Sequence, residues 1–300
     1  MTVQFDPASL VLLNVIMAFM MFGVSLNLKP DDFRRVLAIP RAPVAGLFAQ
    51  FLLLPAATCL FTAVFRIDPQ LALGMILVAS CPGGSFSNIM TWLCKGSVAV
   101  SVSMTAVSSL AATVMTPLNF AFYGWLNPHT RAYLQDIALP AENLLTLVLL
   151  VLALPLLIGM MTGGRFPTLA ARSEKPLRVI SLLVFLAFVA IAFLNNVELF
   201  LTEFHTFFWL VVGHNLLALA LGFGIARLMR LPVPDQRAVT MEVGIQNSGL
   251  GLVILFTFFP DAGGMMLITA FWGVWHLVSG LTLSQIWARR PLPELSQQQS

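Results

Sequence analysis

Long apolar stretches alternate with short polar segments along the whole chain. Each stretch holds roughly 20 residues, which is the length that a helix needs to cross the hydrocarbon core of a bilayer. We therefore predict an all-α, polytopic membrane protein that forms a single membrane domain over residues 1–300. The nine predicted spans cover about 8–28, 42–65, 70–94, 97–126, 140–162, 177–196, 205–229, 237–259 and 263–288.

The third predicted span is interrupted near its middle. It contains Pro82-Gly83-Gly84, followed by the polar residues Ser85, Ser87 and Asn88. Proline removes a backbone donor, and glycine weakens a helix further. Non-helical backbone survives at membrane depth only where protein buries it or where it lines a cavity. We interpret this segment as a true break in the helix rather than a kink.

The eighth predicted span contains Glu242, the one acidic residue that lies deep inside a long apolar stretch. Two glycines, Gly244 and Gly249, flank it together with the polar run Gln246-Asn247-Ser248. An ionisable side chain at bilayer depth costs free energy, and by default it marks an ion or substrate pathway. The alternative is a neutral Glu242 that is merely hydrogen-bonded to a neighbouring helix.

The two interrupted spans occupy corresponding positions in the two halves of the chain, and they cross the membrane in opposite directions. This arrangement is typical of an inverted repeat with two discontinuous helices. In such a repeat the N-termini of the half-helices attract an anion, while freed carbonyls and side-chain oxygens hold cations. The sequence therefore predicts a binding site at the two breaks.

The fourth predicted span carries a hydroxyl side chain at every fourth residue from Ser97 to Thr113, so these residues line one face of a helix. Ser101 and Thr105 follow the first break closely enough to donate oxygens to an ion. Other polar groups are isolated within apolar spans, namely Gln50, His214-Asn215 and His276. Taken alone, each is more typical of a helix–helix contact than of a ligand.

The distribution of positive charge sets the orientation. The loops after odd-numbered spans and the C-terminal end hold all but two of the 16 lysine and arginine residues, the exceptions being Arg66 and Arg131. Positive loops stay in the cytoplasm. We therefore predict a multi-pass protein of the cell membrane, with its N-terminus outside and its C-terminus in the cytoplasm.

Composition excludes a soluble domain. Hydrophobic residues make up 58% of the chain and charged residues 10%, whereas soluble proteins use about 25% charged residues. The basic residues are explained by topology and lie beside lipid headgroups. We predict the lipid bilayer as a partner, no nucleic-acid partner, and no protein partner.

The available ligands are carboxylate, amide, hydroxyl and backbone oxygens, without a Cys/His cluster. This set favours a hard cation over zinc or copper. Sodium fits a transport site best, and a proton carried by Glu242 alone is the rival. We predict a transporter and not an enzyme.

Two other classes stay open as alternatives. A channel would need a continuous polar lining, and only the fourth span offers a long polar stripe. A membrane-embedded hydrolase would need a nucleophile with a paired base, such as Ser87 with His214 or His276. No nucleophile elbow or metal motif supports this hydrolase.

Two motifs at matching spacing carry a resemblance to a known family. One is the run from Glu242 to Gly249. The other is the run from Pro82 to Asn88, followed by the segment from Lys95 to Ser101. Both are similar to the two broken helices of the bile acid:sodium symporter family, and the similarity covers nearly the whole chain.

The resemblance implies a core domain that moves against a panel domain. The core would comprise the spans at about 42–126 and 205–288, and the panel those at about 8–28 and 140–196. Its implied activity is sodium-coupled symport of an organic anion, such as a bile acid, a pantoate-like acid or a keto acid. Two sodium ions would serve as the coupling ions.

The resemblance also implies the site residues. The first sodium would bind among Ser87, Asn88, Ser101, Thr105 and Glu242. The second would bind among Gln50, Glu242, Gln246 and the backbone of Val243 and Ile245. The anion would lie near Ser85, Phe86, Asn247, Ser248 and His276.

Two features depart from the family pattern. Bacterial relatives commonly have ten spans, and this chain is expected to lack the first. Leu277 follows Trp275-His276 at a position where asparagine is common. The lost amide affects the anion site more than the sodium sites.

Overall fold

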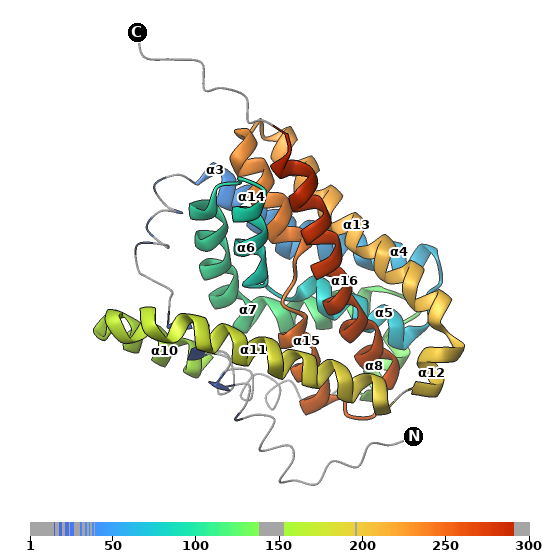
Figure 1. Cartoon of the computed structure of the whole chain (residues 1–300). Helices are drawn as coiled ribbons and strands as arrows, with labels where there is room; N and C mark the ends of the chain where they lie inside the picture. Colours follow the sequence, from blue (N-terminus) through green and yellow to red (C-terminus); the bar gives the residue numbers. More distant parts are fainter. Residues whose placement is uncertain are drawn as a thin grey trace.

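A computed structural model describes residues 40–137, 153–195 and 197–290, with scattered positions between 15 and 38. Every regular element in this part of the chain is a helix (Figure 1). The helices are α3 (Arg41–Phe48), the π-helical turn η1 (Ala49–Leu53), α4 (Leu54–Val64), α5 (Pro69–Ser80), α6 (Phe86–Leu93), α7 (Val98–Leu126), α8 (Arg131–Ile137), α10 (Leu154–Arg165), α11 (Pro167–Asn195), α12 (Val197–Thr202), α13 (Phe204–Leu228), α14 (Val233–Gly244), α15 (Ser248–Phe258) and α16 (Gly263–Ala288).

Four helical stretches within the described residues are long and apolar enough to cross a membrane. They are Arg41–Val64, which joins α3, η1 and α4, then Val98–Leu126, Phe204–Leu228 and Gly263–Ala288. These match the second, fourth, seventh and ninth predicted spans. Most of the first predicted span and most of the fifth lie outside the described residues.

The third and eighth predicted spans are each divided into two helices, as the sequence indicates. The third consists of α5 and α6, which are separated by residues 81–85. The eighth consists of α14 and α15, which are separated by residues 245–247. Each half alone is too short to cross the bilayer, because a span needs about 20 residues.

Two connections differ from the prediction. The sixth span was expected to begin near residue 177, but α11 begins at Pro167 and continues through Pro176. Proline is well suited to the first helical position, and the residues between the two prolines are good helix formers, so the charged segment is helical rather than a loop. The predicted loop at 127–139 contains the short helix α8.

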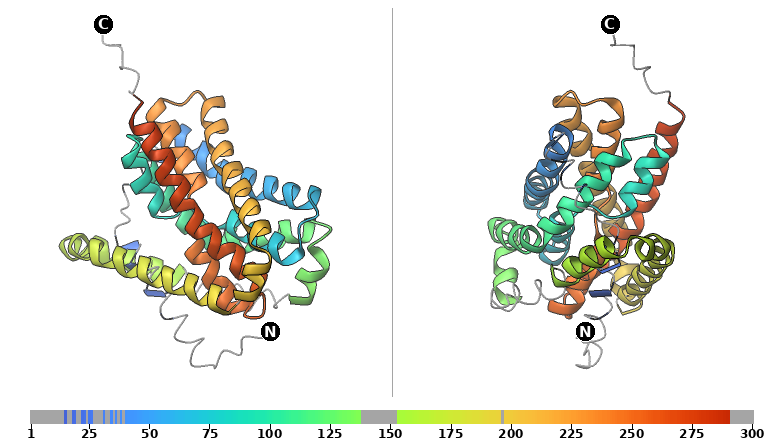
Figure 2. Two further views of the ribbon diagram at one scale, coloured as in Figure 1. Left: turned by 45° about the vertical axis from the view of Figure 1, so that its right-hand side comes forward. Right: turned by 90° about the vertical axis from the view of Figure 1, so that its left-hand side faces the viewer.

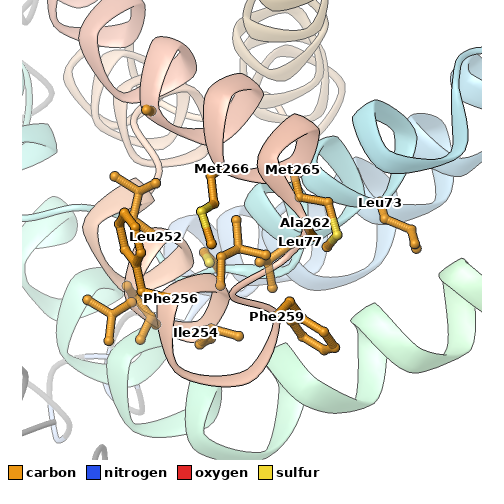
Figure 3. Packing of buried hydrophobic residues seen from close by; sticks show 14 of the residues in the cluster. Leu73, Leu77, Leu252, Ile254, Phe256, Phe259, Ala262, Met265 and Met266 are labelled. Carbon is orange, nitrogen blue, oxygen red and sulfur yellow. The ribbon is translucent and has the colours of Figure 1, made fainter. Parts of the chain in front are cut away.

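The half-helix α15 packs with the start of α16 against α5 (Figure 3). Leu252 and Phe256 of α15, Met265 of α16 and Leu77 of α5 are all buried. Lipid tails are as apolar as leucine, so close van der Waals packing holds such helices together. This packing holds the break at residues 245–247 close to α5, the first half of the third span.

The helices α10 and α11 lie across one end of the bundle, while α13, α14 and α16 run side by side away from it (Figures 1 and 2). α11 contacts α16 and α15, and α14 contacts α6, α7 and α13. The two interrupted helices therefore lie at the centre of the described bundle.

Candidate functional site

The two interrupted helices meet at their breaks. The Gly84 amide donates to the Ile245 carbonyl at 2.7 Å, and the Asn247 amide donates to the Pro82 carbonyl at 2.9 Å. Gly83 and Gln246 thus form an isolated antiparallel bridge. The non-helical backbone of each break satisfies its hydrogen bonds on the other break, as membrane depth requires.

The local sequence explains the geometry of the two breaks. Cys81 is extended because the following Pro82 disfavours helical backbone before it. A side chain on Gly83 would collide with the Glu242 carboxylate, so only glycine allows this close approach. On the other break, the Asn247 side chain accepts from the Leu250 amide at 3.0 Å and so caps α15.

Four helix ends converge at the crossing. The N-termini of α6 and α15 begin there, at Phe86 and Ser248. The helices α5 and α14 end there, and a side-chain amide donates a hydrogen bond to a carbonyl at the end of each. Gln50 Nε2 donates to the Cys81 carbonyl at 2.7 Å, and Asn215 Nδ2 donates to the Gly244 carbonyl at 2.9 Å. The crossing therefore offers positive helix ends to an anion and carbonyl oxygens to a cation.

Glu242 is fully buried, and hydroxyl groups from two neighbouring helices surround its carboxylate. Ser87 of α6 donates to Oε2. From α7, Ser101 lies 3.1 Å from Oε2 and Thr105 lies 2.7 Å from Oε1. The single ion pair among the described residues is Arg34–Asp31, so no described cationic side chain neutralises Glu242.

Two of the hydroxyl groups around Glu242 have competing acceptors. Asn88 Oδ1 lies 2.8 Å from the Ser101 hydroxyl and 3.3 Å from the Thr105 hydroxyl. Each of these hydroxyls thus lies within reach of both Asn88 and the carboxylate. A hydroxyl carries only one proton, so it cannot donate to both acceptors. The cluster is suited to a cation that oxygens would coordinate.

A second polar group lies around Gln50. Its Nε2 lies 2.5 Å from Gln246 Oε1, in addition to its bond to Cys81, and Gln246 Nε2 donates to the Val243 carbonyl at 2.7 Å. Gln50 Oε1 is buried without a hydrogen-bond partner in the described structure. An unpaired buried oxygen of this kind costs free energy unless a ligand satisfies it. The Ile245 carbonyl already accepts from Gly84.

The residues predicted to bind the anion lie around the two helix N-termini, but they do not form one polar cluster. Ser85 is exposed, and Asn247 is partly exposed. Ser248 Oγ lies 3.3 Å from His276 Nδ1 inside the protein. Phe86 packs with Leu277 against a buried apolar cluster. The predicted anion site is therefore exposed at Ser85 and buried at Ser248 and His276.

The histidines do not pair with Ser87. His214 Nε2 lies 2.8 Å from the Thr58 hydroxyl, and His276 contacts Ser248. Ser87 donates to Glu242 instead. The pairing that a hydrolase based on Ser87 would need is therefore not formed.

Sequence reasoning missed three supporting residues. Thr91 Oγ1 lies 3.3 Å from Ser101 Oγ, and Ser279 donates to Asn215 Oδ1 at 2.6 Å. Asn215 was treated as an isolated polar group, although it holds the end of α14. Its depth in the membrane, comparable to that of Gln50 in the other half of the chain, could have indicated this role. Thr91 and Ser279 had no such signal, because small hydroxyl residues are common in membrane helices.

The start of α14 is fixed to the loop between α6 and α7. The Ser97 amide donates to the Pro234 carbonyl at 2.9 Å, and Arg237 donates to the Cys94 carbonyl at 2.5 Å. Burial raises the pKa of the neighbouring Asp235 carboxyl, and a hydrogen bond from Ser97 partly offsets this rise. These contacts hold α7 and α14 in register, and both helices supply residues to the Glu242 cluster.

The sequence profile of the Sodium Bile acid symporter family matches residues 14–203. The chain belongs to this family. It is 30% identical over 280 residues to a Bacillus subtilis protein named uncharacterized sodium-dependent transporter YocS, covering 93% of this chain and 83% of that one. With its apolar helices, the family membership makes this chain a multi-pass membrane protein.

Relatives from eukaryotes are longer than this chain. It is 30% identical over 272 residues to the Arabidopsis thaliana protein named probable sodium/metabolite cotransporter BASS1, chloroplastic, covering 90% of this chain and 65% of that one. It is 31% identical over 242 residues to the human P3 protein, covering 78% of this chain and 48% of that one. Similar proteins thus occur in bacteria, plants and mammals, and the chain spans about two thirds of the plant relative and about half of the human one.

Proposed function

We propose that this protein is a sodium-coupled symporter of a small organic anion. The observation that carries the proposal is the Glu242 cluster, a buried carboxylate that hydroxyl and amide oxygens surround and that has no described cationic partner. Such a set of hard oxygen ligands suits a small monovalent cation. The names of the relatives, which include a sodium-dependent transporter and a sodium/metabolite cotransporter, support the same function.

Two sodium ions are proposed to bind beside the crossing. The first would be held by Ser87, Asn88, Ser101, Thr105 and Glu242, whose side chains already contact one another. The second would be held by Gln50, Glu242, Gln246 and the carbonyls of Val243 and Ile245. The unpaired oxygen of Gln50 supports this second site, because a cation would satisfy it.

The organic anion is proposed to bind at the N-termini of α6 and α15. Ser85, Phe86, Asn247, Ser248 and His276 would contact it. The positive ends of the two half-helices would attract its charge, and their influence falls off within the first turn. A bile acid, a pantoate-like acid or a keto acid would each meet this requirement for an anion.

Charge balance links the ions to the anion. With Glu242 ionised, two bound sodium ions and a bound monoanion would make the loaded site neutral, which lowers the cost of moving it through the bilayer. Each cycle would carry one net positive charge inward, which supplies about 2.3 kcal/mol per 100 mV of membrane potential. Each tenfold sodium gradient adds about 1.4 kcal/mol per ion.

Transport would proceed by alternating access. The spans at about 42–126 and 205–288 would form the core, and those at about 8–28 and 140–196 the panel. The core would rock against the panel and expose the crossing to each side in turn. The positive loops support placement in the cell membrane with the N-terminus outside and the C-terminus in the cytoplasm.

The test is the thermal stability of the purified protein in sodium, compared with potassium at equal ionic strength. A ligand that binds only the folded state stabilises it by about 1.4 kcal/mol at ten times its Kd, which corresponds to a rise of a few degrees in Tm. We expect this rise with sodium alone. Equal melting temperatures in the two salts would contradict the proposal.

A proton-coupled carrier is the second candidate. It is favoured by the absence of a described cationic partner for Glu242, because a proton would also neutralise the carboxylate. In this case the melting temperature would depend on pH in the same way in sodium and in potassium. A sodium-specific rise would reject this candidate.

A further inference from the structure

The helices α13 and α16 lie side by side (Figures 1 and 2). An apolar groove lies between them, on the surface of the bundle. It has a volume of about 450 Å³. Leu216 of α13, and Val278 and Ile286 of α16, line it and are among the exposed large hydrophobic residues. Trp275 lines it near the middle of α16, and Trp287 lines it near the C-terminal end of that helix.

The groove offers no free hydroxyl to a ligand. The Thr240 hydroxyl donates to the Gln236 carbonyl at 2.7 Å, and the Thr282 hydroxyl donates to the Val278 carbonyl at 2.8 Å. The Ser279 hydroxyl is used by Asn215, as described above. Because each lining hydroxyl is satisfied inside the protein, the groove favours a hydrocarbon chain over a polar molecule.

The length of the groove matches one leaflet of a membrane. Trp275 and Trp287 are twelve residues apart on a helix, which corresponds to about 18 Å. Half of a hydrocarbon core of about 30 Å is about 15 Å. An acyl chain that follows the groove would therefore end near the headgroup level of the leaflet at the Trp287 end.

Exposed cationic side chains gather at the Trp287 end. The guanidinium of Arg227 lies 5.7 Å from the ring centroid of Phe223, which lines the groove. Arg289 and Arg290 follow the end of α16 and are exposed. Within the described residues, none of these three arginines forms an ion pair. The buried Arg237 is different, because carbonyl groups occupy its guanidinium.

We propose that this groove binds an anionic phospholipid, with one acyl chain between α13 and α16 and the phosphate beside Arg227 and Arg289. Ser25, in the described part of the N-terminal segment, lies elsewhere, since it contacts the Pro155 carbonyl of α10. A phosphate beside Arg227 would form charge-assisted hydrogen bonds. The proposal goes beyond transport and requires neither sodium nor the organic anion.

The test is thermal unfolding of the detergent-purified protein, titrated with phosphatidylglycerol or with phosphatidylcholine of the same chain length. One arginine near a membrane surface contributes about a five-fold preference for anionic lipid. We expect Arg227→Gln to reduce the preference for phosphatidylglycerol about five-fold. The matched control is Arg131→Gln, because Arg131 is also exposed and lies 4.4 Å from the Trp125 ring, but away from the groove.

The acyl chain is tested separately from the headgroup. Ala220→Phe and Thr282→Phe each fill the groove at an exposed lining position, and both should weaken binding of the two lipids alike. Phosphatidylglycerol with brominated chains should quench tryptophan fluorescence, and Trp275→Phe should reduce the quenching. The proposal would be overturned if the two lipids stabilised the protein equally, or if Arg227→Gln and Arg131→Gln lost the preference for phosphatidylglycerol to the same extent. It would also be overturned if glycerol phosphate, which has no acyl chains, bound as well as phosphatidylglycerol.

Discussion

At the scale of single residues, the central feature is a carboxylate without a described cationic partner. Glu242 is fully buried, and its neighbours are hydroxyl and amide groups rather than lysine or arginine. An ionised group in this position is costly unless a counter-ion accompanies it. Under the proposed function, this cost would couple ion binding to the conformation of the protein, because the site would be most stable with its ions bound.

Gln50 provides a prediction about the second sodium. Gln50→Met removes the unpaired oxygen and both donated hydrogen bonds, while it keeps the length of the side chain. We expect the Hill coefficient for sodium to fall from about two to about one, and the apparent sodium affinity to fall about tenfold, which corresponds to about 1.4 kcal/mol. The measurement is Tm against sodium concentration.

The matched control for Gln50 is Asn119→Leu. Asn119 is a buried amide that donates to the Phe51 carbonyl at 2.8 Å, so its loss also removes a tie between helices. Such a hydrogen bond stabilises a membrane protein by about 0.6–1.7 kcal/mol. Asn119→Leu should lower the stability and leave the sodium titration unchanged. An equal loss of sodium response in both variants would contradict a ligand role for Gln50.

Some of these residue roles could be predicted from the sequence, and others could not. Glu242, Ser101 and Thr105 stood out because polar groups are rare in apolar spans, and the structure brings them together. Thr91 and Ser279 could not be predicted, because their roles depend on partners that lie on other helices. The paired roles of Gln50 and Asn215 became visible only when both helix ends were in place.

At the scale of elements, the crossing depends on glycine in the first break. Gly83→Ala should push Glu242 away from Ser87, because the added methyl group would overlap the carboxylate. Overpacking of this kind costs about 1–3 kcal/mol. We expect at least a tenfold loss of sodium affinity, measured by the sodium-dependent change in Tm.

The control for the first break is Gly224→Ala on α13, where an added methyl group meets no atom within 4 Å. Alanine is a better helix former than glycine, so this variant should be as stable as the wild type or slightly more stable. Its sodium response should be unchanged. A normal sodium response in Gly83→Ala as well would show that the close approach at the break is not needed.

The start of α14 predicts a dependence of stability on pH. The pKa of Asp235 is raised by burial, so the folded protein binds this proton more tightly than the unfolded chain does. The resulting stabilisation is complete below the ordinary aspartate pKa of about 3.9 and is lost as the pH rises through the higher folded-state pKa. Asp235→Asn cannot titrate, so its Tm relative to the wild type should increase with pH. A constant difference across the pH range would contradict this prediction.

The positions of the breaks were predictable because Pro82, the glycines and the polar side chains all disfavour a continuous helix locally. The start of α11 was not predictable in the same way. Its charged first half and Pro176 are typical of a loop, but Pro167 begins a helix that continues through both. Helix propensity in this segment outweighed the pattern of charge.

At the scale of the whole molecule, the two interrupted helices explain why the proposed function assigns both ions and the anion to one site. Each interrupted helix contributes one N-terminus and one C-terminus to the crossing, so ends of opposite polarity lie together. Gln50 and Asn215 perform the same task in the two halves, since each holds the carbonyl at the end of the first half-helix. Under the proposed function, a site shared by the two interrupted helices would be well placed to respond when the core moves against the panel.

The most direct test of the central claim is equilibrium binding of ²²Na⁺ to the purified protein, with potassium as the competing salt. The proposed function predicts saturable binding of two sodium ions per chain in the wild type and in Asn119→Leu. Glu242→Gln should lose this binding, because the shared carboxylate is gone while the size of the side chain is kept. Absence of saturable binding in the wild type, or full binding in Glu242→Gln, would contradict the account.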